Sequence, residues 1–136
     1  MTLSEIRKGL VGYWSQNYIT TPTIYPNSKV PDELLKENFV ALLIDFTNSE
    51  VVGNGGTGAG TEGTLTRRYG MLSVVIFCRK ESGTKTIYEI ADEAVELLER
   101  KRIATSIVMR ASHITDIKDN KEYYTMTVEV PFKTSV

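Results

Sequence analysis

The chain has 136 residues, of which 41% are hydrophobic and 24% charged, and a formal net charge of −1. This length predicts one domain with its own core, residues 1–136, and the near-neutral charge excludes any global attraction to nucleic acid or an anionic membrane. Cys78 and His113 are the only cysteine and histidine, which excludes an internal disulfide and a Cys/His zinc site and fits synthesis in a reducing, intracellular compartment.

The first predicted element is an amphipathic helix from Thr2 to about Asn17. Thr2 and Glu5 have capping-box spacing, and the apolar stripe of this helix is formed by Leu3, Ile6, Leu10 and Trp14. No secretory leader or membrane span is expected, because no long apolar block is present. Prolines at 22, 26 and 31 then favour extended chain, with a short edge strand at Thr23–Tyr25, a turn, and one helical turn from Pro31.

The segment Asn38–Thr47 reads as a strand that is apolar on both faces, which predicts a position covered on both sides or inside a sheet. A glycine-rich stretch, Gly53–Gly63, follows it. Residues 53–58 match GxGxxG, but a phosphate site of that kind needs a helix to begin there. The next residues, Thr64–Lys80, have strand composition, so we expect a long loop between two strands that becomes ordered against a partner.

Gly70 should mark a bulge or bend in the long strand Thr64–Lys80. The second predicted helix runs from Thr86, with Glu89 in capping-box position, to about Arg100, and its apolar stripe is Ile87, Ile90, Ala91, Ala94 and Leu97 or Leu98. Two further strands are expected at Ile103–His113 and Tyr123–Phe132, with a hairpin tip at Asp119–Asn120. The predicted fold is therefore α+β, with a mixed or antiparallel sheet of about four strands packed against two helices.

A search for catalytic groups finds little. Ser112 and His113 are strand neighbours that would point to opposite faces, and Cys78 reads as a small buried residue. The acidic residues are not forced together by their spacing: Asp45, Asp92, Glu93, Glu96, Asp116 and Asp119. We therefore expect no catalytic, cofactor-binding or metal-binding residue, and no enzyme.

Arg67 and Arg68 form a basic pair beside the glycine-rich loop. Two arginines are a small footprint for nucleic acid, and as strand neighbours they should face opposite ways. Repeated around a symmetric ring, one arginine per subunit would make a collar of positive charge or a row of intersubunit ion pairs.

The elements in this order resemble the phage tail terminator (tail completion) proteins, which form rings at the end of phage tails. The resemblance spans nearly the whole chain. It rests on the first helix ending near Trp14, on TPTIYPN with NFVALLIDF, on the Gly-rich loop with RRYGMLSVVIF, and on SGTKTIYEIADEAVELL with the closing TMTVEVPF.

This resemblance implies a structural virion protein, assembled in the host cytoplasm and located in the virion tail. It would form a hexameric ring that terminates tail polymerisation and joins the head. Its partners would be other copies of itself, the tail tube protein and the head connector or neck proteins, with DNA only passing through the ring and no membrane. The interface would include Gly53, Asn54, Gly55, Gly56, Gly58, Gly60, Arg67 and Arg68.

Two other interpretations stay open from the sequence. A head-closure or connector-completion subunit of the neck would share this pattern and differ in its partners. A small anion- or nucleotide-binding domain would use the Gly-rich loop, although the missing helix argues against it.

Overall fold

The structure is a computed structural model that describes residues 1–26, 37–54 and 64–134. Its elements, in chain order, are α1 (Leu3–Asn17), β1 (Thr23–Ile24), β2 (Phe39–Asn54), β3 (Thr64–Arg79), the short 3-10 helix η2 (Lys80–Ser82), α2 (Gly83–Leu98), β4 (Arg102–Ile103), β5 (Ile107–Met109), β6 (His113–Ile114), β7 (Lys118–Asn120) and β8 (Tyr123–Thr134). The α+β class predicted from the sequence is confirmed.

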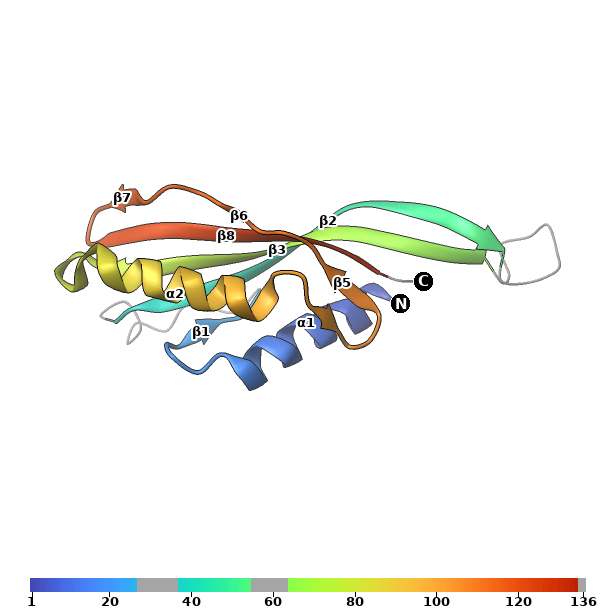
Figure 1. Ribbon diagram of the computed structural model, residues 1–136, viewed down its shortest axis with the longest axis horizontal. Helices are drawn as coiled ribbons and strands as arrows, with labels where there is room; N and C mark the ends of the chain where they lie inside the picture. The colour runs from blue at the N-terminus through green and yellow to red at the C-terminus, as the bar shows by residue number, and fades with distance from the viewer. Residues whose placement is uncertain (27–36, 55–63, 135–136) are drawn as a thin grey trace.

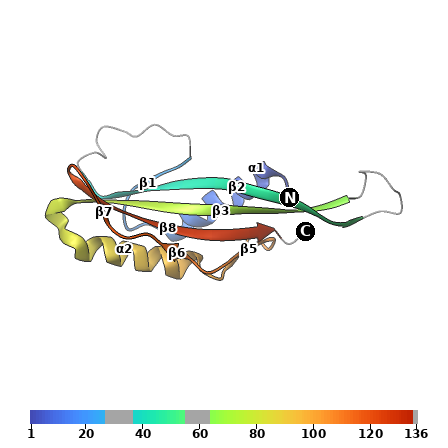
Figure 2. The ribbon, with the colours of Figure 1, turned by 90° about the horizontal axis from the view of Figure 1, so that it is seen from above.

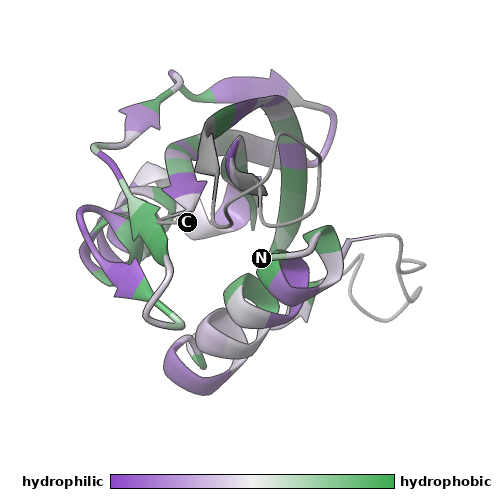
Figure 3. Ribbon diagram, turned by 90° about the vertical axis from the view of Figure 1, so that its right-hand side faces the viewer, coloured by the Kyte–Doolittle hydropathy of each residue, from purple (hydrophilic) through white to green (hydrophobic). Residues whose placement is uncertain are grey.

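All eight strands belong to one sheet, with the order β1-β2-β3-β8-β5-β4. β1 runs parallel to β2, whereas the other pairs are antiparallel, so the sheet is mixed. β5, β6 and β7 follow one another along the same side of β8, and β4 pairs with the outer side of β5. Viewed along the molecule, the sheet is curled (Figure 3).

The prediction of about four strands is too low because the expected strand Ile103–His113 is broken into three and because the short strands β1 and β7 add two more. Ala104 and Thr105 have positive φ values of 50° and 58°, which end β4 in a tight turn. After β5, the amide and hydroxyl of Ser112 donate to Glu99 and not to β8. Pairing with β8 resumes at His113. Side-chain and turn contacts that the apolar pattern does not encode therefore interrupt this edge.

Both helices pack on the same face of the sheet (Figure 1). The Thr2 hydroxyl caps α1 by accepting from the Glu5 amide at 3.1 Å, as predicted. Ile6, Leu10 and Trp14 are fully buried, while Leu3 is 48% exposed. The predicted stripe of α2 is also confirmed, because the buried residues of that helix are Ile87, Ile90, Ala91, Ala94 and Leu98. These side chains pack against the buried face of β2, β3 and β8.

Two predicted boundaries are wrong by a few residues. α2 begins at Gly83 and not at Thr86, because η2 leads directly into it and the Thr86 hydroxyl bonds back to the Ser82 carbonyl. The tip of the last hairpin is also displaced. Asn120 still pairs with Tyr123, and the turn uses Lys121, whose φ is 47°. The helical turn expected from Pro31 lies outside the described residues.

Candidate assembly surfaces

The outer halves of β2 and β3 form a two-stranded ribbon that extends beyond the helices (Figure 1). We call residues 48–54 and 64–69 the arm; they pair with each other from Asn48↔Tyr69 to Asn54↔Thr64. β1 pairs with β2 only at Val40 and Ala41, and the ladder between β8 and β3 ends at Tyr69. The Arg68 amide still donates to the Thr134 hydroxyl at the end of β8, at 2.9 Å. Among the described strands, the arm beyond Arg68 therefore has no neighbour on either edge.

The glycine-rich prediction falls partly on this arm. Gly53 and Asn54 end β2, and Thr64 begins β3, so a strand and not a helix follows the loop, as expected. The loop glycines 55, 56, 58 and 60 lie outside the described residues. The register slips between Phe46 and Asn48 and again between Val51 and Gly53. The first slip lies opposite Gly70, so the predicted irregularity is at this level of the sheet, with the extra residue in β2.

Arg67 and Arg68 lie on opposite faces of the arm, as the strand period predicts. Arg68 is opposite Ser49, and its Nη1 donates to the Ser49 hydroxyl at 2.9 Å. Arg67 is opposite Glu50, whose carboxylate accepts instead from the Tyr69 hydroxyl at 3.1 Å. Arg68 shares the side of Gly70, facing the helices, and we call this side the underside of the arm.

Neither arginine is neutralised inside the part of the chain that the structure describes. No carboxylate of the described residues lies within ion-pair distance of Arg67 or Arg68. The Nε atoms of both are buried without a hydrogen-bond partner there. A buried donor without an acceptor costs free energy, and a carboxylate supplied by a partner would neutralise the charge of either guanidinium.

A hollow of about 250 Å³ lies where the arm leaves the rest of the molecule. We call it the arm notch. It is bounded by the start of α1 and by the inner part of β2, through Leu3, Ser4, Arg7, Pro26, Ile44 and Phe46. Leu3 and Phe46 are 48% and 41% exposed, so apolar surface stays open beside the Arg7 cation.

A second open surface is the face of the sheet opposite the helices. Figure 2 looks onto this face, and no helix crosses in front of β2, β3 or β8. Alternation with the buried Leu42 and Leu72 places Leu43 and Met71 on it. β2 does lie inside the sheet, between β1 and β3. The prediction of cover on both faces is nevertheless wrong for the described chain, since Leu43 is 48% exposed.

The end of the sheet farthest from the arm is closed by aromatic and ionic contacts that the sequence analysis missed. Phe39 stacks on Phe77 at 4.6 Å, and the edge of Tyr123 meets both rings. Arg79 lies over the Tyr123 ring and pairs with Glu81 and Glu122. Hydrogen bonding to Tyr123 and Glu81 raises the pKa of Arg79. Only the strand register brings these residues together, so composition gave no signal for them.

The candidate catalytic groups do not converge. The Ser112 hydroxyl donates to Glu99 and so cannot pair with His113, which is exposed on β6 opposite Glu129. The Ser112 hydroxyl and amide lower the pKa of the Glu99 carboxyl by stabilising its charged form. Cys78 is buried, and burial raises the pKa of its thiol to about 11.

Within residues 1–26, 37–54 and 64–134, no three His, Cys, Asp or Glu side chains are grouped so that they could hold a metal ion. The helices of the same residues include none that is long and apolar enough to cross a membrane.

Comparison with known proteins shows the fold alone. No protein-family model matches the chain, and no curated protein matches it. Fifteen chains of solved structures match. One of them superposes with a TM-score of 0.70 at 12% sequence identity, over 100% of this chain and 97% of that chain. At this identity the likeness says that the arrangement of helices and strands occurs elsewhere, and it carries no activity.

Proposed function

We propose that this chain is a structural assembly protein of the phage tail terminator kind. Copies of it would form a hexameric ring at the end of a tail tube, stop the growth of the tube and present the surface that joins the head. In this role the protein acts through its surfaces, as a component of the virion tail, and needs no catalytic residue or cofactor.

The arm is the observation that carries the proposal. A two-stranded ribbon is at best marginally stable in water, and its free edges invite pairing or packing with another chain. Here the ribbon also carries Val51, which is 65% exposed, and two arginines without a carboxylate partner among the described residues. Such a projection gains stability when a neighbouring subunit covers it.

The half-covered sheet face supports the same role. Leu43 is 48% exposed, and Met71, Val75 and Phe77 are half-buried on the same face of the neighbouring strand β3. Large contiguous apolar surface on a small protein is typical of an interaction site. The resemblance in sequence pattern to tail terminator proteins names the assembly that these two surfaces would serve.

Light scattering coupled to size-exclusion chromatography, over a concentration series, tests the proposal together with negative-stain images. We expect a concentration-dependent ring with an open centre, and binding of that ring to the ends of isolated phage tail tubes. A protein that remains monomeric at every concentration, also with tail tubes present, would rule the proposal out. Rings that bind isolated neck connectors and ignore tubes would favour the head-closure subunit instead.

A further inference from the structure

We propose that the acidic outer stripe of α2 in one copy of this chain docks under the arm of a second copy. The contact would place Tyr88 in the arm notch, beside Arg7, and pair Asp92 with Arg68. It rests on the proposed function only in taking self-assembly as given, and it names the two surfaces that meet.

The outer side of α2 is strongly acidic, with Lys85 as its only basic residue. Its acidic residues, including the one that caps its end, are Glu89, Asp92, Glu93, Glu96 and Glu99. Three of them already have partners: Glu89 lies 3.8 Å from Lys85, and two accept hydrogen bonds from Thr20 and Ser112. Asp92 and Glu96 are exposed and have no hydrogen-bond or ion-pair partner in the part of the chain that the structure describes.

These two carboxylates belong to a single stripe with an aromatic residue. Tyr88, Asp92 and Glu96 follow each other at intervals of four residues, which places them on one side of a helix. Tyr88 is 53% exposed. Tyrosine is among the residues that contribute most to the binding free energy when they become buried in a protein interface.

The arm offers the complementary surface. Its underside carries Arg68 and continues into the notch, where Arg7 stands beside the exposed Leu3 and Phe46. The Arg68 Nη1 donates only to a serine hydroxyl, and its Nε has no acceptor among the described residues. A carboxylate would neutralise the Arg68 charge, because a guanidinium binds carboxylates through its N–H groups.

The dimensions of the two surfaces agree. Four residues of helix rise by about 6 Å, so the tyrosine ring and the two carboxylates are spaced at about that interval. On the arm, Arg68 is two residues along β3 from Gly70, which is opposite Phe46. Two residues of strand span about 7 Å, so the apolar notch and the Arg68 cation are separated by one comparable step.

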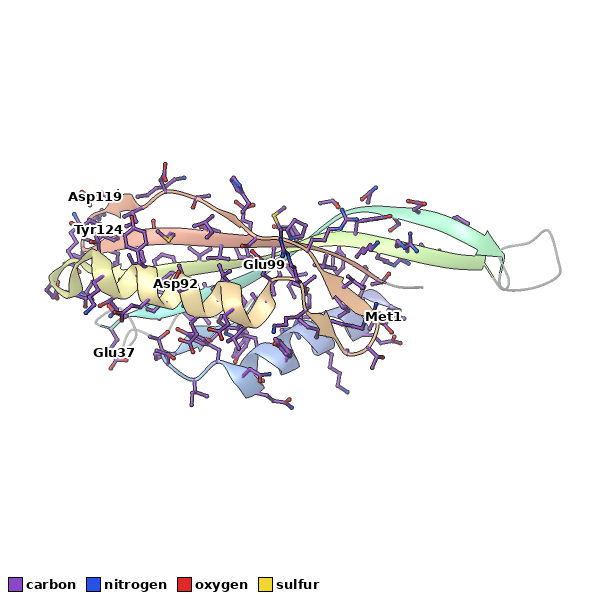
Figure 4. The ribbon with its side chains drawn as sticks, viewed as in Figure 1. Met1, Glu37, Asp92, Glu99, Asp119 and Tyr124 are labelled. Atoms are coloured by element: carbon purple, nitrogen blue, oxygen red, sulfur yellow. The ribbon has the colours of Figure 1, made fainter. Side chains whose placement is uncertain are left out.

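The contact cannot form within one copy. α2 lies under the body of the sheet, whereas the arm projects from the opposite end of the molecule (Figure 1), and Asp92 on α2 is correspondingly remote from the arm (Figure 4). The two surfaces are different parts of the same chain, so their meeting is a heterologous, head-to-tail contact. Repetition of such a contact produces either a closed ring or an open filament.

Charge reversal tests this pairing, with an exposed cation far from both surfaces as the matched control. Arg68→Glu and Asp92→Arg should each raise the dissociation constant for self-association, measured by sedimentation velocity, by about tenfold or more. Lys118→Glu makes the same change of charge on β7, at the end of the molecule opposite the arm (Figure 1), and should leave that constant nearly unchanged. Thermal unfolding followed by circular dichroism checks that each variant is folded.

An equimolar mixture of the Arg68→Glu and Asp92→Arg proteins should associate again. In alternating order, each junction then joins either the native pair or the reversed pair, and both are attractive. The native complex should also weaken as salt is raised, because the pairs at the rim are screened.

Several results would overturn the inference. These are native-like association of Arg68→Glu, equal weakening by Lys118→Glu, a mixture of folded variants that does not recover, or association that requires an added oligonucleotide. Rings that survive Arg68→Glu would leave the proposed function standing and remove only this contact. Salt-sensitive open chains that never close into rings would support this contact and argue against the proposed function.

Discussion

The body and the arm are built from the same two strands and differ in what surrounds them. In the body, β3 is paired on both sides, and its residues Leu72, Val74 and Ile76 are fully buried under the helices. Beyond Arg68, whose amide bonds to the Thr134 hydroxyl, only β2 lies beside β3 among the described strands, and the exposed fraction of Val51 on β2 reaches 65%. Burial against helices therefore stabilises the body within one chain, while the arm needs a partner.

The change takes place over a few residues around Gly70. Here β2 carries its extra residue, and β8 ends its pairing with β3 one position farther, at Tyr69. The Phe132 ring packs so closely on Gly70 that a Cβ there would lie 2.5 Å from it. The junction is thus the last well-packed layer of the body.

Truncation of a core side chain should have the largest effect and separate the two regions most clearly. Trp14 is fully buried, stacks on Tyr18 at 4.4 Å, and donates from its indole nitrogen to the Thr23 hydroxyl. Trp14→Ala should lower the free energy of unfolding by about 3–5 kcal/mol, because it leaves a cavity and an unsatisfied hydroxyl. Urea unfolding followed by circular dichroism measures this.

The matched change on the arm is Val51→Ala, which should alter the free energy of unfolding of the monomer by no more than about 0.5 kcal/mol. If Trp14→Ala and Val51→Ala lowered the free energy of unfolding by similar amounts, the arm would unfold cooperatively with the body and would not depend on a partner for its stability.

Glycine substitutions test the packing of the junction, and their expected effects on stability are smaller than that of Trp14→Ala. Gly70→Ala places a Cβ 2.5 Å from the Phe132 Cζ and 2.6 Å from the Asp45 carbonyl oxygen, so it should destabilise the protein by about 1–3 kcal/mol. In Gly12→Ala, within α1, the added Cβ meets nothing within 4 Å, so this change should stabilise the protein by about 0.5–1 kcal/mol. Thermal unfolding of both proteins gives the comparison, and an unchanged midpoint for Gly70→Ala would show that the junction repacks freely.

The smallest effect should be a pH dependence located in the body. Hydrogen bonds from Ser112 lower the pKa of Glu99 below its ordinary value of 4.5. The carboxylate then contributes stability that is present above the unfolded pKa and is lost as pH falls through the folded value. Glu99→Gln should therefore flatten the fall of the unfolding midpoint below about pH 4.5. Glu96→Gln on the outer stripe of α2 serves as the control, and identical profiles for the two variants would contradict this role for Glu99.

Local patterns predicted the elements that depend on neighbours in sequence. The stripe of α2, the cap of α1 by Thr2, the edge strand at residues 23–24 and the buried alternation of β8 all follow from spacing alone. The broken edge of the sheet did not, because a carboxylate after α2 captures the Ser112 amide across the fold. The Phe39 and Phe77 stack likewise depends on register between distant segments.

The candidate surfaces show the same division. By itself, the sequence determined that a strand follows the glycine-rich segment and that Arg67 and Arg68 face opposite ways, because composition and the period of two are local properties. Only the tertiary structure decided that the pairing of β8 with β3 ends at Tyr69, so that an arm remains. It also decided that the acidic stripe on α2 lies far from this arm. Which strand ends first is set by pairing between distant segments, and a single run of residues does not carry that information.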